Sequence, residues 1–275
     1  MTLDSSYNFR ASFAEEVSLP EGELDLQRAA LYLAGEEYPD LDVDRYLGRM
    51  DDMAAEVRSL AGNSDKLESL ARALNSYLFD INGFSGNTGN YYDPDNSFLN
   101  RVMETGIGIP ITLSVLYLGV AKRLGLNGHG VGMPGHFLVK IEELDLYLDP
   151  FHDGQLLSAG DCRRLAEHLF GPNVEWDKRF LSATPAVSTL TRMLNNLRII
   201  YSQRRDLVRL VAVLERMMLI NPSNVALCRD LAICHVEQGN RAAAVRSLEE
   251  LISVATNESD VAAARTFIEN IIRNG

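Results

Sequence analysis

The side chains best suited to chemistry are a histidine and an aspartate, His136 and Asp149. They stand at the outer ends of the runs HFLVKI and LDLYLD, in which side-chain character alternates on either side of Glu142-Glu143. Alternation of this kind predicts two antiparallel strands joined by a turn. A carboxylate beside an imidazole fixes its tautomer and suits it to act as a general base. The hairpin therefore predicts a His–Asp pair.

The register of the hairpin decides how closely the pair lies. With strands over His136–Ile141 and Leu144–Asp149, His136 faces Asp149 directly. However, two glutamates suit a two-residue primed turn poorly. A longer turn shifts the register by two residues and places Asp149 diagonal to His136, which is still within side-chain reach.

An apolar helix is expected just before the hairpin. Pro110 suits its first position, and Gly125 suits the residue that follows its end at Leu124. The free N–H groups of such a helix start can lower the pKa of a thiol or hold an oxyanion. In this turn the candidate nucleophiles are the hydroxyls of Thr112 and Ser114, although hydroxyls in a buried helix usually bond to the carbonyl one turn back.

The segment from Asn82 to Ser97 is rich in Gly, Asn, Asp and Ser and is expected to be a long loop. Asp93, Asn96 and Asn100, together with Pro110, are candidate binding residues that would line a cleft. Asp-Pro and Asn-Ser pairs also form ordinary turns and caps, so both interpretations remain open.

Potential metal ligands gather around the hairpin: His129, His136, Asp149, His152 and Asp153. Their spacing matches no compact zinc motif, so we expect no metal site. We also expect no cofactor.

The cysteines are Cys162, Cys228 and Cys234, an odd number without a CxxC motif, and we expect them to be reduced and packed. The start of the sequence does not resemble a secretory leader, and no apolar run is long enough to span a membrane. These features predict a cytoplasmic protein.

The net charge of −12 is unevenly distributed. Residues 1–184 carry 15 basic and 29 acidic side chains, whereas residues 185–275 carry 11 and 9. An acidic first part argues against binding along nucleic-acid phosphates. We therefore expect neither a nucleic-acid nor a membrane partner.

The rest of the chain is predicted to be mainly helical. Residues 1–20 should be irregular, and residues 171–185 should form a linker. Apolar periodicity and breakers predict the following helices and short strand: helices 24–34, 42–61, 64–81, 98–104 and 161–170, and a strand at 155–157.

Residues 186–275 should form helical repeats. Leu197 and Leu214 recur as Leu231 and Leu248 at a spacing of 34 residues, which is the tetratricopeptide period. The resulting division is a first domain over 1–184 and a repeat domain over 185–275.

Four strings carry a resemblance to a known family: YYDPDNSFLN, GIPITLSVLYLGVAKRLGL, GVGMPGHFLV and YLDPF. They resemble the SirB type of bacterial transglutaminase-like proteins, which have tetratricopeptide-like repeats at the C-terminus. The resemblance implies an α+β fold: a papain-like core with a small antiparallel sheet, then an all-α region. It assigns His136 and Asp149 to the family's Cys-His-Asp triad. The family cysteine belongs in the first turn of the helix that starts at Pro110, where this chain has none.

Two classes of function follow. The absent cysteine favours a non-catalytic, regulatory interaction module that binds a protein through its cleft or its repeats. The retained His136 and Asp149 favour a hydrolase or transferase of amide or ester bonds that uses a hydroxyl nucleophile. The sequence favours the non-catalytic interaction module over the enzyme, and it does not identify a substrate or a partner.

Overall fold

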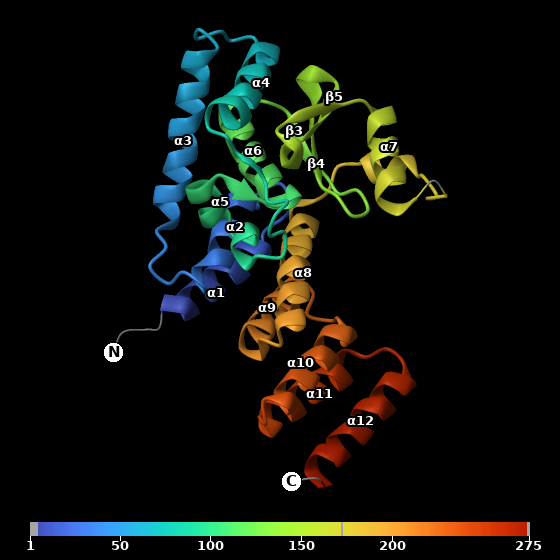
Figure 1. Ribbon diagram of the computed structural model, residues 1–275. Coiled ribbons are helices and arrows are strands. Elements are labelled where there is room, and N and C mark those ends of the chain that lie inside the picture. The colour runs from blue at the N-terminus through green and yellow to red at the C-terminus, as the bar shows by residue number, and fades with distance from the viewer. Residues whose placement is uncertain (1–4, 172, 274–275) are drawn as a thin grey trace. The chain divides into compact units, whose positions relative to one another are not determined.

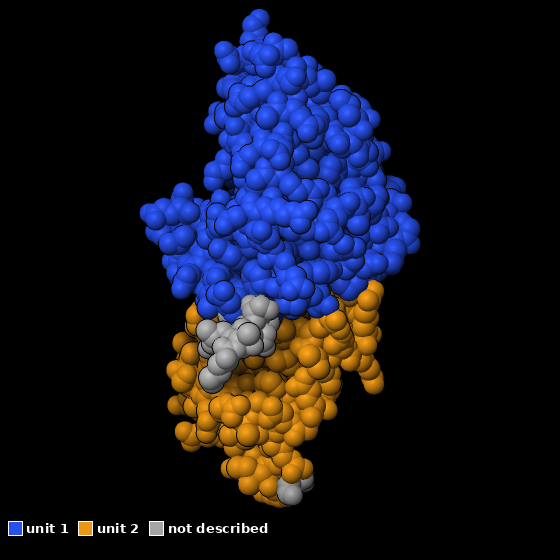
Figure 2. Space-filling view, turned by 90° about the vertical axis from the view of Figure 1, so that its left-hand side faces the viewer, with its two compact units in different colours: residues 1–193 blue, residues 194–275 orange. Residues whose placement is uncertain are grey.

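The computed structural model describes residues 5–171 and 173–273. They form two compact units, residues 1–193 and 194–275 (Figure 2). The boundary predicted from the sequence, which separates a first domain over 1–184 from a repeat domain over 185–275, stays a prediction. The first unit contains the following helices and strands, of which the last helix, α8, continues into the second unit: α1 (Ser5–Val17), α2 (Leu26–Gly35), α3 (Val43–Leu60), α4 (Leu67–Asn75), β1 (Ser85–Gly86), α5 (Leu99–Thr105), β2 (Ile107–Gly108), α6 (Pro110–Leu124), β3 (Gly128–Val131), β4 (Leu138–Ile141), β5 (Leu146–Asp149), β6 (Gln155–Leu157), α7 (Ala159–Phe170) and α8 (Ala186–Arg204).

Helix α6 is the central helix of the first unit. It begins at Pro110 and ends at Leu124, where Gly125 adopts the left-handed conformation (φ +79°), as predicted. Nearly all of its side chains are buried, which explains a sequence that is apolar on all sides. The polar Gln27 of α2 reaches it and donates a hydrogen bond to the Val115 carbonyl (3.0 Å).

A four-stranded antiparallel sheet lies between α6 and α7 (Figure 1). Its strand order is β3-β4-β5-β6. On one face Leu138 packs with Cys162 of α7. On the other, Ile141 and Leu118 of α6 both approach Gly128, where an added Cβ would lie 2.9 Å from Ile141 and 3.1 Å from Leu118. The small antiparallel sheet of the predicted α+β fold is therefore confirmed.

The register of the hairpin differs from the direct pairing predicted for it. Val139 pairs with Leu148 and Lys140 with Tyr147, a shift of two residues. The turn is longer because Glu142–Leu144 form a 3₁₀ turn, and Asp145 closes it in the left-handed conformation (φ +50°). The alternative register, with Asp149 diagonal to His136, is confirmed.

Some predicted elements are wrong. Residues 5–17 of the segment expected to be irregular form α1, and residues 1–4 lie outside the described range. The glycine-rich segment before His136, for which no strand was predicted, contains β3; at Gly130 an added Cβ would lie 2.6 Å from the Phe137 ring. The helix expected over 64–81 starts at Leu67 and becomes a π-helix over Ser76–Ile81.

The second unit is entirely helical in the part described. After the end of α8 come α9 (Leu207–Ile220), α10 (Val225–Glu237), α11 (Arg241–Val254) and α12 (Glu258–Arg273). The 34-residue period has a structural counterpart. Asp206 caps α9 through the N–H of Arg209, and its equivalent Asn240 caps α11 through the N–H of Ala243.

None of the helices in residues 5–171 and 173–273 has the length and apolar character needed to cross a bilayer.

The close approach of β1 to the turn after β5 generates a prediction. A Cβ added to Gly86 would lie 2.5 Å from the Phe151 carbonyl oxygen and would also overlap the Phe151 ring. Gly86→Ala should therefore lower the free energy of unfolding by about 1–3 kcal/mol, measured by urea denaturation. The matched control is Gly22→Ala, because no atom lies within 4 Å of that added Cβ. Equal stability of the two variants would contradict this packing.

Candidate functional site

The predicted His–Asp pair is formed. The Nε2 atom of His136 lies 2.8 Å from Oδ2 of Asp149. Both residues are buried, with 6 % of His136 and 1 % of Asp149 exposed. His136 precedes β4 and Asp149 ends β5, so the sheet itself positions the two side chains.

A second histidine, His152, which strand alternation does not pair with Asp149, completes the cluster. Nδ1 of His152 also lies 2.8 Å from Oδ2 of Asp149, and its side chain is half exposed. The other carboxylate oxygen, Oδ1, accepts hydrogen bonds from the backbone N–H groups of Phe151 and His152. Asp149 is thus both a strand end and the cap of the 3₁₀ turn Pro150–His152.

The environment keeps Asp149 ionised. Burial by itself raises the pKa of a carboxyl group, but hydrogen bonds from His136 and His152 outweigh it and hold the pKa of Asp149 below its ordinary value. A charged carboxylate can accept an N–H from each ring. Each imidazole then donates through the nitrogen nearest Asp149.

Arg192 of α8 holds the segment that leads into His136. Its guanidinium donates hydrogen bonds to the carbonyls of Met133 (3.1 Å) and His136 (2.9 Å) and lies over the Phe137 ring. Burial lowers the pKa of Arg192. Arg192 is separated from His136 by more than fifty residues, so no local pattern in the sequence pointed to it.

The predicted binding loop reaches the cluster through aromatic rings. Tyr91 packs edge-on against Phe151 (5.9 Å between ring centroids), and Phe151 packs edge-on against His136 (6.2 Å). Asn96 is buried and supports this loop, because its Nδ2 donates to the carbonyls of Asn90 and Tyr91. The loop and the His–Asp pair therefore form one continuous packed region.

The other candidate binding residues have local contacts. Asp93 caps the 3₁₀ turn Pro94–Ser97 by accepting the N–H of Asp95. Asn100 is buried in α5, and its Oδ1 has no hydrogen-bond partner in the described part of the chain. Pro110 is the buried first residue of α6. A ligand-binding role for these residues stays a prediction.

The two hydroxyls in the first turn of α6 both bond to backbone. Thr112 Oγ1 donates to the Asn96 carbonyl (2.6 Å) and accepts the N–H of Ile109 (3.2 Å). Ser114 Oγ donates to the Pro110 carbonyl (2.7 Å). Both side chains are completely buried. They therefore act as structural hydrogen-bonding groups of the helix start in this conformation.

The three thiols are free and buried. Burial, with a further effect from the Asp161 charge, raises the pKa of Cys162 to about 12. Burial also raises the pKa of Cys228 and Cys234. A reactive cysteine needs the opposite shift, because the thiolate is the nucleophile.

The cluster also has the atoms to hold a metal. Within the described residues, one ligand atom from each of His136, Asp149 and His152 lies within 4.8 Å of the others. His129 lies elsewhere, with its Nδ1 3.6 Å from a carboxylate oxygen of Glu142.

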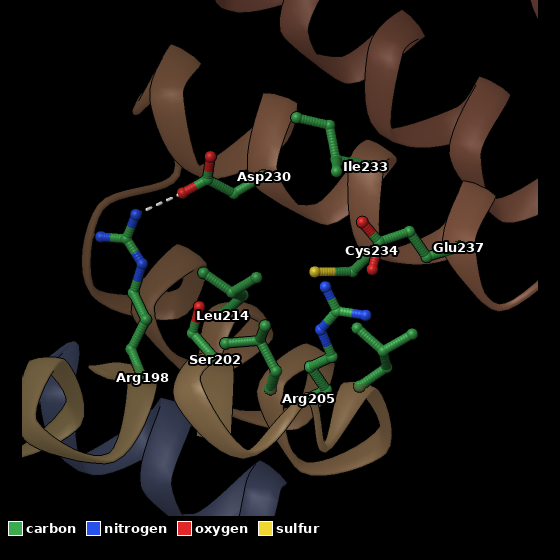
Figure 3. A pocket seen from close by; sticks show the side chains of 10 residues that line it. Arg198, Ser202, Arg205, Leu214, Asp230, Ile233, Cys234 and Glu237 are labelled. Carbon is green, nitrogen blue, oxygen red and sulfur yellow. Dashed lines mark hydrogen bonds and ion pairs between the residues drawn. The ribbon is translucent and has the colours of Figure 1, made fainter. Parts of the chain in front are cut away.

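A separate pocket of about 400 Å³ lies in the second unit (Figure 3). Leu210, Leu214 and Ile233 supply apolar lining, and Arg198 forms an ion pair with Asp230. The Arg205 side chain points into the pocket towards Cys234 and Glu237 (Figure 3). It forms no hydrogen bond or ion pair with the described residues.

Comparison with known proteins assigns the first part of this architecture. The profile of the transglutaminase-like superfamily matches residues 44–195, more than half of the chain. The chain belongs to the transglutaminase-like superfamily. A tetratricopeptide repeat profile matches residues 197–269, which agrees with the 34-residue period. No solved structure matches the chain.

Several relatives of this transglutaminase-like chain are bacterial. It is 34 % identical over 253 residues to a UPF0162 protein of Xylella fastidiosa (strain 9a5c), with 90 % of each chain covered. It is 26 % identical over 205 residues to a UPF0162 protein of Pseudomonas aeruginosa, covering 73 % of this chain and 74 % of the relative. It is also 33 % identical over 135 residues to mouse F-box only protein 21, covering 46 % of this chain and 21 % of that protein.

The four hydrogen bonds to Asp149 generate a stability prediction. Asp149→Ala should lower the free energy of unfolding by about 2–4 kcal/mol, because it leaves buried donors without a partner. Urea denaturation in EDTA measures this effect without a contribution from bound ions. Asp44→Ala is the matched control: its carboxylate pairs with Arg28 but its side chain is 84 % exposed, so the midpoint should change little. A similar loss in both variants would contradict the proposed role of Asp149.

Proposed function

We propose that this transglutaminase-like protein is a non-catalytic, regulatory interaction module that binds a protein segment through its repeat unit. The observation that carries the proposal is the first turn of α6. The family's nucleophilic cysteine belongs there, and this chain has Pro110, Thr112 and Ser114 instead. Both hydroxyls are buried and hydrogen-bonded to carbonyls, which disfavours the hydroxyl-nucleophile alternative.

The retained His136–Asp149 pair is compatible with a structural role. Asp149 joins the end of β5 to the following turn, and His136 satisfies the same carboxylate from the adjacent strand. A catalytic base must reach the proton it removes, and a nucleophile must lie beside it. The hydroxyls nearest the start of α6 are already engaged with Asn96 and Pro110.

The pocket of the second unit is the proposed partner site. Its apolar floor would take a large apolar side chain, and Arg205 would take a neighbouring carboxylate. Arg205 is in the left-handed conformation (φ +54°), and the residue 34 positions later is Gly239 (φ +74°). Glycine adopts this conformation at little cost, whereas arginine does not. An arginine at this strained position supports a binding role for its side chain.

The wider classification is part of the same proposal. The four sequence strings support membership of the SirB type, and the reduced, buried cysteines support a cytoplasmic location. The acidic charge of residues 1–184 supports a protein partner over a nucleic acid.

The proposed absence of catalysis can be tested directly. The protein should not incorporate an amine into a glutamine donor protein and should not hydrolyse a peptide library. Iodoacetamide should label the folded protein far more slowly than the urea-unfolded protein, because Cys162 is buried and its pKa is about 12. Turnover that is lost with iodoacetamide and with Cys162→Ser would contradict this prediction. Turnover lost in Thr112→Val or Ser114→Ala would support the hydroxyl enzyme instead.

The partner site can be tested with peptides selected from a displayed library on the wild-type protein. The selected peptides should combine an acidic residue with a large apolar one. Arg205→Glu should weaken their binding at least about tenfold, because a charge-assisted hydrogen bond is replaced by repulsion. Arg265→Glu is the matched control, since it makes the same charge change on an exposed part of α12 away from the pocket.

Arg205→Gly separates binding from stability. It should raise the free energy of unfolding by roughly 0.5–1 kcal/mol by relieving the left-handed backbone, and it should weaken peptide binding. Stabilisation with unchanged peptide binding would show that the arginine has no part in recognition.

A further inference from the structure

The cluster around Asp149 brings together three donors of the kind that bind transition metals. Nε2 of His136 and Nδ1 of His152 each lie 2.8 Å from the same oxygen, Oδ2 of Asp149. The two imidazole centroids are 5.8 Å apart. Two imidazoles and one carboxylate form a recurrent ligand set for zinc and related ions.

The surrounding structure orients these donors in advance. Backbone N–H groups of the turn hold Oδ1 of Asp149, so Oδ2 is directed at the two rings. Phe151 lies edge-on to His136 and to His152, with interplanar angles of 85° in both cases. Arg192 fixes the backbone of His136 through its carbonyl. Support of this kind, outside the ligands themselves, is typical of metal sites.

The buried carboxylate of Asp149 has no permanently charged ion-pair partner among the described residues. The Asp149 side chain is 2 % exposed, and within the described residues its ion-pair partners are the two histidines, which are charged only when protonated. A buried carboxylate is costly without a positive counter-charge. A divalent cation would supply that charge at the point where the three donors converge.

We propose that His136, Asp149 and His152 form a binding site for a divalent transition-metal ion, with zinc as the preferred ion. Three protein ligands leave a fourth position, and the half-exposed side of His152 opens it to water or to a donor from a partner. The site does not depend on the peptide pocket proposed above.

Metal binding requires an adjustment of the cluster: each imidazole gives up its hydrogen bond to Asp149 and presents a lone pair, and its proton moves to the other ring nitrogen. Ligand atoms around tetrahedral zinc lie roughly 3.3 Å apart, given bonds of about 2.0–2.1 Å. The two N···O distances of 2.8 Å must therefore lengthen by about half an ångström. His152 can provide this movement because it lies in a turn at the surface, whereas His136 and Asp149 are buried.

The test is a zinc titration of the full chain. After EDTA treatment and removal of the chelator, calorimetry at neutral pH should show one Zn²⁺ bound per chain, and zinc should raise the melting temperature. His152→Ala should weaken binding at least about a hundredfold, since loss of a direct ligand should exceed the effect of losing an outer contact. The matched control, His129→Ala, should bind as the wild type does.

A second variant guards against loss of structure. His152→Gln retains a donor for Asp149 and removes the imidazole, so a folded protein with unchanged circular dichroism should still fail to bind zinc. Cobalt provides a readout of geometry: the visible bands of tetrahedral Co²⁺ should appear with the wild type and His129→Ala only. Absence of zinc binding to the wild type would overturn the proposal. Equal affinity in the wild type, His152→Ala and His152→Gln would also overturn it, since the ion would then be bound elsewhere.

Discussion

The buried carboxylate of Asp149 is the constraint around which the first unit is arranged. It needs several donors at once, and they come from separate segments: His136 ahead of β4, and the backbone and ring of His152 in the next turn. This requirement fixes the end of β5 relative to β4. It also brings Phe151 against β1, where only glycine fits at position 86. Because a buried carboxylate needs hydrogen-bond donors, the segments that supply them are packed closely around Asp149.

The sequence predicted the pairing of His136 with Asp149 because strand alternation is a strong local signal. It predicted the limits of α6 for a similar reason, since Pro110 and Gly125 each favour a specific backbone conformation. The direct register failed because it depended on the turn, where Asp145 adopts an unusual left-handed conformation. β3 was missed because its glycines resemble a loop, although the Phe137 ring packs directly against Gly130. His152 could have been found: a histidine three residues after an Asp-Pro cap returns to the capping carboxylate.

The first turn of α6 shows how a helix start can serve structure instead of chemistry. Its threonine accepts the N–H of Ile109 and donates to the carbonyl of Asn96. Asn96 in turn holds the carbonyl of Tyr91, whose ring contacts Phe151 beside His136. A single hydroxyl therefore links the helix to the loop that packs against the His–Asp pair. No periodicity reveals this connection, because its members come from three segments that only tertiary packing brings together.

In the second unit, two positions 34 residues apart share a backbone conformation but differ in side chain. Positions 206 and 240 use different residues for the same cap, so the helices start alike. The preceding positions, 205 and 239, share a left-handed backbone, and glycine is the residue that adopts it with least strain. The backbone conformation shared by positions 205 and 239 therefore explains the glycine at 239 but not the arginine at 205. The arginine side chain points into the pocket beside Cys234 and Glu237 (Figure 3), where the equivalent glycine would place no side chain, so the proposed binding role would account for the strained position.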